Sequence, residues 1–258
     1  MRILLATITC EKGDVDGNLA RHLDLLAAAR DAGCGLAVFP ELGLTGSVDP
    51  VRHPERAVAL GHKAVGRLVE ATAATGVAAV FGLGERRRDS YAITQVSAAG
   101  GAVAAVQRKR HLADDEEGFS TSTATAVFEV EGVTVGTVIC AEAGVDFTWD
   151  ATAAAGARLV CFCSAPGLYG RRTDEASWRA GFEWWEGCGL GDARRHARRL
   201  GVWVAMATQA GPTVDEDFPG IAALVSPEGE VVARLPDWRP GTLLVEVPLT
   251  PRVERAGT

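Results

Sequence analysis

Short apolar runs recur along most of the chain and alternate with segments whose apolar residues are spaced as in helices. The strand-like runs are Ile3–Cys10, Leu36–Phe39, Val77–Phe81, Arg158–Cys163 and Val202–Ala207. Helices are expected around Leu19–Leu26, Val58–Val69, Thr148–Ala155 and Ser177–Leu200, with Gly33 and Gly76 ending the first two. This alternation predicts an α/β protein in which helices cover β-sheets.

Hairpins interrupt the alternation. Glycine-containing turns at 100–101, 132 and 227–229 each join two strand-like runs. The hairpins are Tyr91–Ser97 with Ala102–Arg108, Val127–Val130 with Val133–Ile139, and Ile221–Val225 with Val231–Leu235, and Leu243–Val247 is a last strand. Helices combined with hairpins predict a mixed sheet system and not a purely parallel Rossmann fold. The sequence shows no domain boundary and no internal repeat, so residues 1–258 are expected to form a single domain.

Charge and composition argue against several classes of protein. The formal net charge of −7 disfavours a nucleic-acid-binding protein, because phosphate recognition needs a basic surface. No apolar stretch is long enough to span a membrane, and the N-terminus lacks the features of a secretory signal. We therefore expect a cytoplasmic protein with no membrane or nucleic-acid partner, whose six cysteines are thiols and not disulfides.

Three reactive side chains each follow the end of a predicted strand. Glu41 lies two residues after Phe39, Lys109 directly follows Arg108, and Cys140 directly follows the strand 133–139. Ligands bind at the carboxyl ends of strands in α/β folds, so these three side chains are candidates for one active site.

A Cys, a Glu and a Lys together can perform acyl transfer. A thiol at neutral pH is mostly protonated and needs a base, and Glu41 could take the proton of Cys140 and return it to a departing amine. Lys109 would stabilise the oxyanion of the tetrahedral intermediate, helped by backbone N–H groups near Cys140. Each residue also has a structural alternative, as a buried thiol, a solvated basic turn or a loop carboxylate.

The segments around these residues resemble the nitrilase superfamily, also called the carbon–nitrogen hydrolase family, in its amidase-like branch. The similar segments are Phe39–Gly46, Arg108–Leu112, Gly132–Cys140, Gly156-Ala157 and Pro227–Val231, so that the resemblance runs from about Arg2 to Pro248. In that family the corresponding Glu, Lys and Cys are catalytic, which implies the same roles for Glu41, Lys109 and Cys140.

The resemblance also implies a fold and an assembly. The expected fold is a four-layer α-β-β-α sandwich with two mixed β-sheets. A second glutamate after the lysine is expected to orient the reacting groups, and both Glu116 and Glu117 are candidates for it. Family members usually form dimers through their helices. Trp184, Trp185 and the arginine-rich segment 194–199 also suggest a homodimer or a higher homo-oligomer here.

Several positions depart from the family pattern around the substrate pocket. Ala141-Glu142 replaces the Tyr-Asp or Trp-Glu that commonly follows the cysteine, and Thr208 replaces an Asn. The loop 164–174 should cross the mouth of the site, where Tyr169, Arg171 and Arg172 could bind an acidic or aromatic group of the substrate. The substrate class is therefore left open by these motifs.

The resulting hypothesis is a hydrolase that releases ammonia from a small linear amide, of the ω-amide or N-carbamoyl type. Nitrile hydrolysis is an alternative, because Glu142 resembles the Cys-Trp-Glu of true nitrilases. A catalytically silent binding or regulatory homologue and a redox-sensing thiol protein are further alternatives. No metal or cofactor is expected, since Cys161 and Cys163 lie in an apolar strand with no partner ligands nearby.

Overall fold

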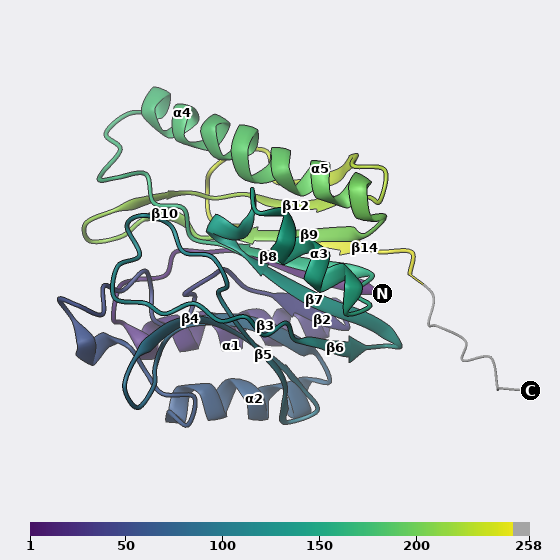
Figure 1. Ribbon diagram of the computed structural model, residues 1–258, viewed down its shortest axis with the longest axis horizontal. Helices are drawn as coiled ribbons and strands as arrows, with labels where there is room; N and C mark the ends of the chain where they lie inside the picture. The colour runs from purple at the N-terminus through teal and green to yellow at the C-terminus, as the bar shows by residue number, and fades with distance from the viewer. Residues whose placement is uncertain (250–258) are drawn as a thin grey trace, which may run out of the picture.

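Two six-stranded mixed sheets lie face to face in the computed structural model, which describes residues 1–249, and helices cover the outer face of each sheet (Figure 1). The first sheet has the order β14 (Gly241–Glu246), β1 (Arg2–Thr7), β2 (Leu36–Val38), β3 (Ala78–Arg86), β4 (Tyr91–Ala99), β5 (Ala102–Arg108). The second has the order β13 (Val231–Arg234), β12 (Ala222–Val225), β9 (Trp203–Thr208), β8 (Leu159–Ser164), β7 (Val133–Ile139), β6 (Val127–Val130). The four-layer sandwich predicted from the sequence is confirmed. Within the single expected domain, residues 250–258 lie outside the described part of the chain.

Each sheet contains both parallel strand pairs and antiparallel hairpins, as predicted for a mixed sheet system. Strands β1, β2 and β3 pair in parallel in one sheet, and β7, β8 and β9 do so in the other. The three predicted hairpins form antiparallel pairs at the sheet edges, and β14 pairs antiparallel with β1. An additional two-stranded sheet, β10 (Ala210–Pro212) with β11 (Asp217–Pro219), was not predicted, because its strands are too short to show an apolar period.

The helices form the outer layers. Helices α1 (Val15–Asp31) and α2 (Lys63–Thr75) cover the first sheet, and α3 (Asp146–Ala154), α4 (Glu175–Trp185) and α5 (Gly191–Leu200) cover the second (Figure 1). The predicted helix 177–200 is interrupted by a π-helical turn, η3 (Glu186–Leu190), which joins α4 to α5. Two short 3₁₀ turns, η1 (Pro54–Arg56) and η2 (Cys140–Glu142), complete the set of helical elements in residues 1–249.

Three hydrophobic cores fill the spaces between the four layers. Side chains alternate between the two faces of a strand, so a strand that is apolar throughout supplies two cores at once. In β8, Cys161 and Cys163 point into the core between the sheets, whereas Val160 and Phe162 point toward the helices. All four side chains are fully buried, and the two cysteines are free thiols of the central core, in agreement with their structural interpretation.

Two glycines of β3 bring the segment that carries Glu41 close to the first sheet. A Cβ atom at Gly82 would lie 2.4 Å from the backbone nitrogen of Leu42, and one at Gly84 would lie 2.7 Å from the Val48 side chain. The backbone of Leu44 donates to the carbonyl of Gly82 at 2.8 Å. The strand was predicted to end at Phe81, but β3 continues to Arg86, and its two glycines permit this close backbone approach.

Among the described residues, no helix is both long and apolar enough to cross a membrane.

The arginine-rich α5 carries ion pairs on its outer side. Arg195 contacts Asp146 at 2.8 Å and Arg199 contacts Asp150 at 2.5 Å, which ties α5 to α3.

Candidate active site

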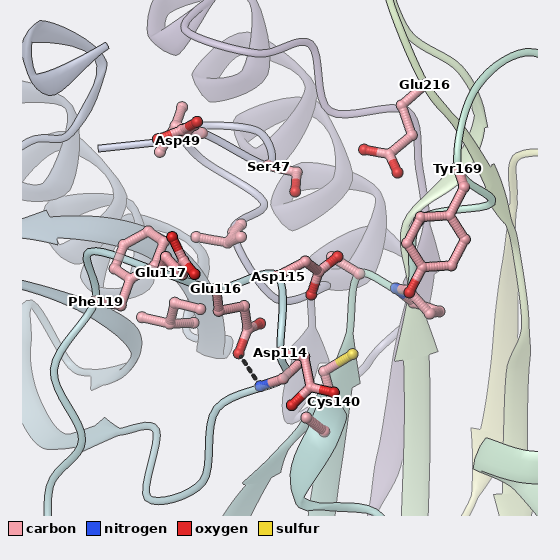
Figure 2. A pocket seen from close by; sticks show the side chains of 18 of the residues that line it. Ser47, Asp49, Asp114, Asp115, Glu116, Glu117, Phe119, Cys140, Tyr169 and Glu216 are labelled. Atoms are coloured by element: carbon pink, nitrogen blue, oxygen red, sulfur yellow. Dashed lines mark hydrogen bonds between the residues drawn. The ribbon is translucent and has the colours of Figure 1, made fainter. Parts of the chain in front are cut away.

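A cavity of about 820 Å³ opens where strand ends of the two sheets meet. Its walls come from the loops that follow β2, β5, β7 and β8, together with the π-helical turn. Figure 2 shows lining side chains from these four loops. Cys140 and Glu116 line this cavity, whereas Glu41 and Lys109 lie beneath its surface and are 1% and 0% exposed. The thiol therefore faces the open space, and a buried carboxylate and ammonium lie below it.

The Glu41 carboxylate is held by two donors. Its Oε1 accepts a hydrogen bond from Lys109 Nζ at 2.7 Å, and its Oε2 accepts one from the backbone N–H of Ala165 at 2.9 Å. The Cys140 thiol is also within hydrogen-bonding reach of this carboxylate. Burial raises the pKa of Glu41 to about 7, against the opposing effect of the Lys109 charge. A carboxyl group with this pKa can take up and release a proton near neutral pH.

Lys109 is a fully buried ammonium group between two carboxylates. Its Nζ donates to Glu41 and to Glu116. Burial by itself would lower the pKa of Lys109, but the neighbouring negative charges, of which Glu41 is the strongest, raise it above its usual value. The lysine is therefore held in its charged form, as a fixed positive charge beside Cys140.

The structure distinguishes the two candidates for the second glutamate. The Glu116 carboxylate accepts two hydrogen bonds, from Lys109 Nζ and, at 2.7 Å, from the backbone N–H of Ala113. Figure 2 shows Glu116 on the cavity wall. Glu117 lines the same cavity but has no such contact with the lysine. Glu116 is therefore the residue placed to orient Lys109.

Cys140 occupies a strained turn at the end of β7. Its φ of 37° lies in the left-handed region, which costs a side chain with a Cβ atom about 1–3 kcal/mol. Burial, followed by the charge of Glu41, raises the pKa of the Cys140 thiol well above its usual value. The resting thiol is therefore protonated, and its proton must leave for a neighbouring base as the sulfur attacks.

Glu142 connects the backbones that carry Lys109 and Cys140. Its Oε1 accepts from the backbone N–H of Arg110 at 2.5 Å, and its Oε2 accepts from the backbone N–H of Ile139 at 3.0 Å. The Arg110 guanidinium donates to Oε2 at 3.0 Å, and both side chains are buried. Glu142 does not line the cavity, so it supports the site from behind.

The loop after β8 differs from the sequence-based expectation. The Tyr169 side chain lines the cavity, with a backbone φ of 52°. Arg171 and Arg172 are not among the lining residues. Arg171 forms an ion pair with Asp217 at 3.1 Å, and Arg172 donates to the carbonyl of Leu168. Asp217 of β11, which the sequence did not single out, has a buried carboxylate that binds Arg171 and the backbone N–H of Arg172. These contacts hold both arginines outside the cavity lining.

Two groups that hold Glu41 were missed by the sequence analysis. The backbone N–H of Ala165 binds the carboxylate, and Gln209 Nε2 donates to the Glu41 carbonyl at 2.8 Å. A backbone N–H carries no residue-type signal, and Gln209 lies far away in the sequence, so neither could be found from a local motif. Within residues 1–249 no group of three or more His, Cys, Asp or Glu side chains is arranged to hold a metal ion.

The buried contact between Arg110 and Glu142 leads to a stability prediction. Replacing Glu142→Gln removes the negative charge but leaves the guanidinium buried, so we expect the free energy of unfolding to fall by about 3 kcal/mol. Asp150→Asn is the matched control, because it breaks the partly exposed ion pair with Arg199 and should cost less than about 1 kcal/mol. Urea unfolding of both variants measures the difference. Equal losses would show that Glu142 is not a structural support of the site.

Comparison with known proteins agrees with the chemistry of the site. A family model described as carbon-nitrogen hydrolase matches residues 4–253. The crystal structure of an amidase from Nesterenkonia sp. is 28% identical with a TM-score of 0.81, and the match covers 96% of this chain and 90% of that chain. A mutant of the same amidase, 27% identical with a TM-score of 0.81 over 96% of this chain and 93% of that one, carries acrylamide at its active site cysteine.

One curated relative is a larger protein. The glutamine-dependent NAD(+) synthetase of Thermotoga maritima is 28% identical over 152 residues, which are 54% of this chain and 25% of that protein. The present chain thus matches about a quarter of that relative's length.

The family model matches nearly the whole chain, so the chain belongs to the carbon-nitrogen hydrolase family of the nitrilase superfamily and is a carbon–nitrogen hydrolase.

Proposed function

We propose that the protein hydrolyses a small linear amide through a thioester on Cys140, with Glu41 as general base and Lys109 as the group that stabilises the oxyanion. The observation that supports this proposal best is the buried contact of Lys109 with Glu41, directly beneath a thiol that faces the cavity. These three side chains provide a nucleophile, a base and a positive charge, as acyl transfer requires.

In the first half-reaction the amide carbon is attacked by sulfur. Glu41 takes the thiol proton while the C–S bond forms, and the oxyanion of the tetrahedral intermediate lies near the ammonium of Lys109. Glu41 then gives the proton to the amide nitrogen, the C–N bond breaks and ammonia leaves. In the second half-reaction Glu41 takes a proton from water while the water oxygen attacks the thioester carbon. The C–S bond then breaks, the acid leaves, and Glu41 returns the proton to the sulfur of Cys140.

The alternatives find less support. Nitrile hydrolysis was suggested by Glu142, but this carboxylate lies behind the site and is occupied by Arg110 and Ile139. A catalytically silent homologue would need no complete set of reactive groups, whereas Glu41, Lys109 and Cys140 are all present and close together. The structurally similar Nesterenkonia enzyme is named an amidase. An amide is therefore the substrate class that we favour.

Variants of the nucleophile and of the base should fail differently. Cys140→Ala removes the nucleophile, so ammonia release should stop. Glu41→Gln keeps the thiol but loses the base, so amide turnover should fall by about a hundredfold or more. Slow acylation by an activated ester should survive in Glu41→Gln, because its leaving group needs no proton. Mass spectrometry of the intact protein should then find an adduct on Cys140 that hydrolyses slowly.

A control separates the role of Cys140 from a general effect of losing a thiol. Cys34→Ala changes a buried cysteine between α1 and β2 and should retain full activity. Turnover of amides by Glu41→Gln at the wild-type rate would show that Glu41 is not the base. Unchanged activity of Cys140→Ala would overturn the mechanism.

The pKa of Glu41 predicts the pH dependence of the reaction. Glu41 must be ionised to accept the thiol proton, and burial raises its pKa to about 7. We therefore expect kcat/KM to increase with pH, with an apparent midpoint near pH 7, because only the deprotonated form is active. The midpoint belongs to the coupled group of Glu41, Lys109 and Cys140 and should be the same for different amides. A midpoint near pH 4.5 would indicate a carboxylate whose pKa burial does not raise.

We further propose a cytoplasmic homodimer that associates through the α4–α5 helical layer. Trp184 is 43% exposed and Phe147 is 55% exposed on this side of the molecule. Burying large apolar side chains of this kind favours association. Multi-angle light scattering at micromolar concentration should give a mass of about twice 27.0 kDa, and a mass of 27.0 kDa would contradict the proposal.

The proposed cytoplasmic location is supported by the six free cysteines, which suit a reducing compartment.

A further inference from the structure

The wall of the catalytic cavity has more negative than positive side chains. Basic side chains contribute two lining residues, Lys12 and Arg52. Acidic side chains contribute seven lining residues, which are Asp49, Asp114, Asp115, Glu116, Glu117, Asp192 and Glu216. The assignment of this cavity as the substrate site rests on Cys140, which lines it, and not on the charge of the wall.

Ion pairs neutralise some of these carboxylates. Four of the seven form an ion pair with a basic side chain. These pairs are Asp49 with Arg52, Glu116 with Lys109, Asp192 with Arg195, and Glu216 with Lys12. Both basic lining residues are thus used. Over residues 1–249, Asp114, Asp115 and Glu117 have neither an ion pair nor a hydrogen bond through their carboxylates, and all three are exposed. Three negative charges therefore remain without compensation at the cavity wall.

These charges act close to the reactive centre. Figure 2 shows the side chains of Asp114, Asp115 and Tyr169 around the sulfur of Cys140. The charge of Asp115, followed by burial and by further charges that include Asp114, raises the pKa of the Tyr169 phenol, so this negative potential reaches across the cavity. An anionic substrate would be repelled at this position, whereas a cationic one would be attracted.

The remaining lining suits an alkyl chain that ends in a cation. Leu42, Val48 and Ile93 supply aliphatic side chains to the lining, and Phe119, Tyr169 and Trp185 supply aromatic ones. Aromatic faces bind ammonium and guanidinium groups through their quadrupoles, which adds to the attraction of the carboxylates. Arg171 and Arg172, the groups that could have bound an acid, are engaged outside the cavity.

We propose that the natural substrate is a linear amide or carbamoyl compound with a positively charged amine or guanidine at its far end, recognised by Asp114, Asp115 and Glu117. This inference rests on the proposed amide hydrolysis and adds the charge of the substrate. The scissile amide would lie at Cys140, the aliphatic chain along the apolar wall, and the cationic end among the uncompensated carboxylates.

Three amides that differ only in their terminal group test the proposal. They are 5-aminopentanamide, which is cationic at pH 7.5, hexanamide, which is neutral, and the monoamide of adipic acid, which is anionic. We expect kcat/KM for ammonia release to be on the order of tenfold higher for the cation than for the neutral amide, with the anion lowest. The preference should shrink at about 1 M ionic strength, where charges are screened beyond about 3 Å.

Charge-neutralising variants identify the residues responsible. The double variant Asp114→Asn with Asp115→Asn should lower the ratio of kcat/KM for the cation to that for hexanamide on the order of tenfold. Asp24→Asn removes the same kind of charge from the exposed side of α1 and should retain the wild-type ratio. Because the readout is a ratio of two substrates, a general loss of activity does not affect it.

The outcomes separate this inference from the proposed function. If hexanamide is hydrolysed at least as well as 5-aminopentanamide, the cationic preference is refuted and amide hydrolysis stands. A preference that is unchanged in the double variant would refute the assignment to Asp114 and Asp115. If wild-type protein releases no more ammonia than Cys140→Ala from any of the three amides, the proposed function fails, and the inference fails with it.

Discussion

The ammonium group of Lys109 is completely buried, and its positive charge has to be balanced by carboxylates close to it. An isolated buried ammonium group is very unfavourable, so it must be paired and hydrogen-bonded. Glu41 and Glu116 provide the two carboxylates, and both are brought there by loops that follow strands of the first sheet. The same ammonium group limits how far burial raises the pKa of Glu41. One buried cation thus determines the position and the protonation of the base.

The proposed nucleophile, Cys140, comes from the second sheet and has to be held against this buried charge. Cys140 ends β7 in a left-handed conformation, and a conformation of this kind persists only where the surroundings stabilise it. The Glu142 carboxylate provides this support, because it binds the backbone before Cys140 and the backbone after Lys109 at the same time. Ala165, which follows β8, then contacts Glu41 from the second sheet. The site is therefore a junction between the sheets, and its geometry depends on how they pack.

The proposed catalytic groups and the carboxylates proposed to select the substrate lie at different depths in the cavity. The groups that we propose to transfer protons are buried, where a low dielectric strengthens their interactions. The uncompensated carboxylates of Asp114 and Asp115 are exposed, where they can attract a substrate without large desolvation costs. The connection between the two levels is the loop 113–118, in which Glu116 turns inward to Lys109 while its neighbours face the cavity.

The order of strands and helices and the three candidate reactive groups could be predicted from the sequence. Apolar runs such as 133–139 and 158–163 predict strands, because burial on both faces leaves a local pattern, and the motifs around Glu41, Lys109 and Cys140 identified the candidate triad. The choice between Glu116 and Glu117 as the partner of Lys109 needed the three-dimensional arrangement. So did the finding that Arg171 and Arg172 are bound outside the cavity. The tertiary structure also revealed Ala165 and the uncompensated charge of Asp114 and Asp115. The physical reason is that strand periodicity is set by neighbours in the sequence, whereas the direction of a loop side chain is set by partners that are distant in the chain.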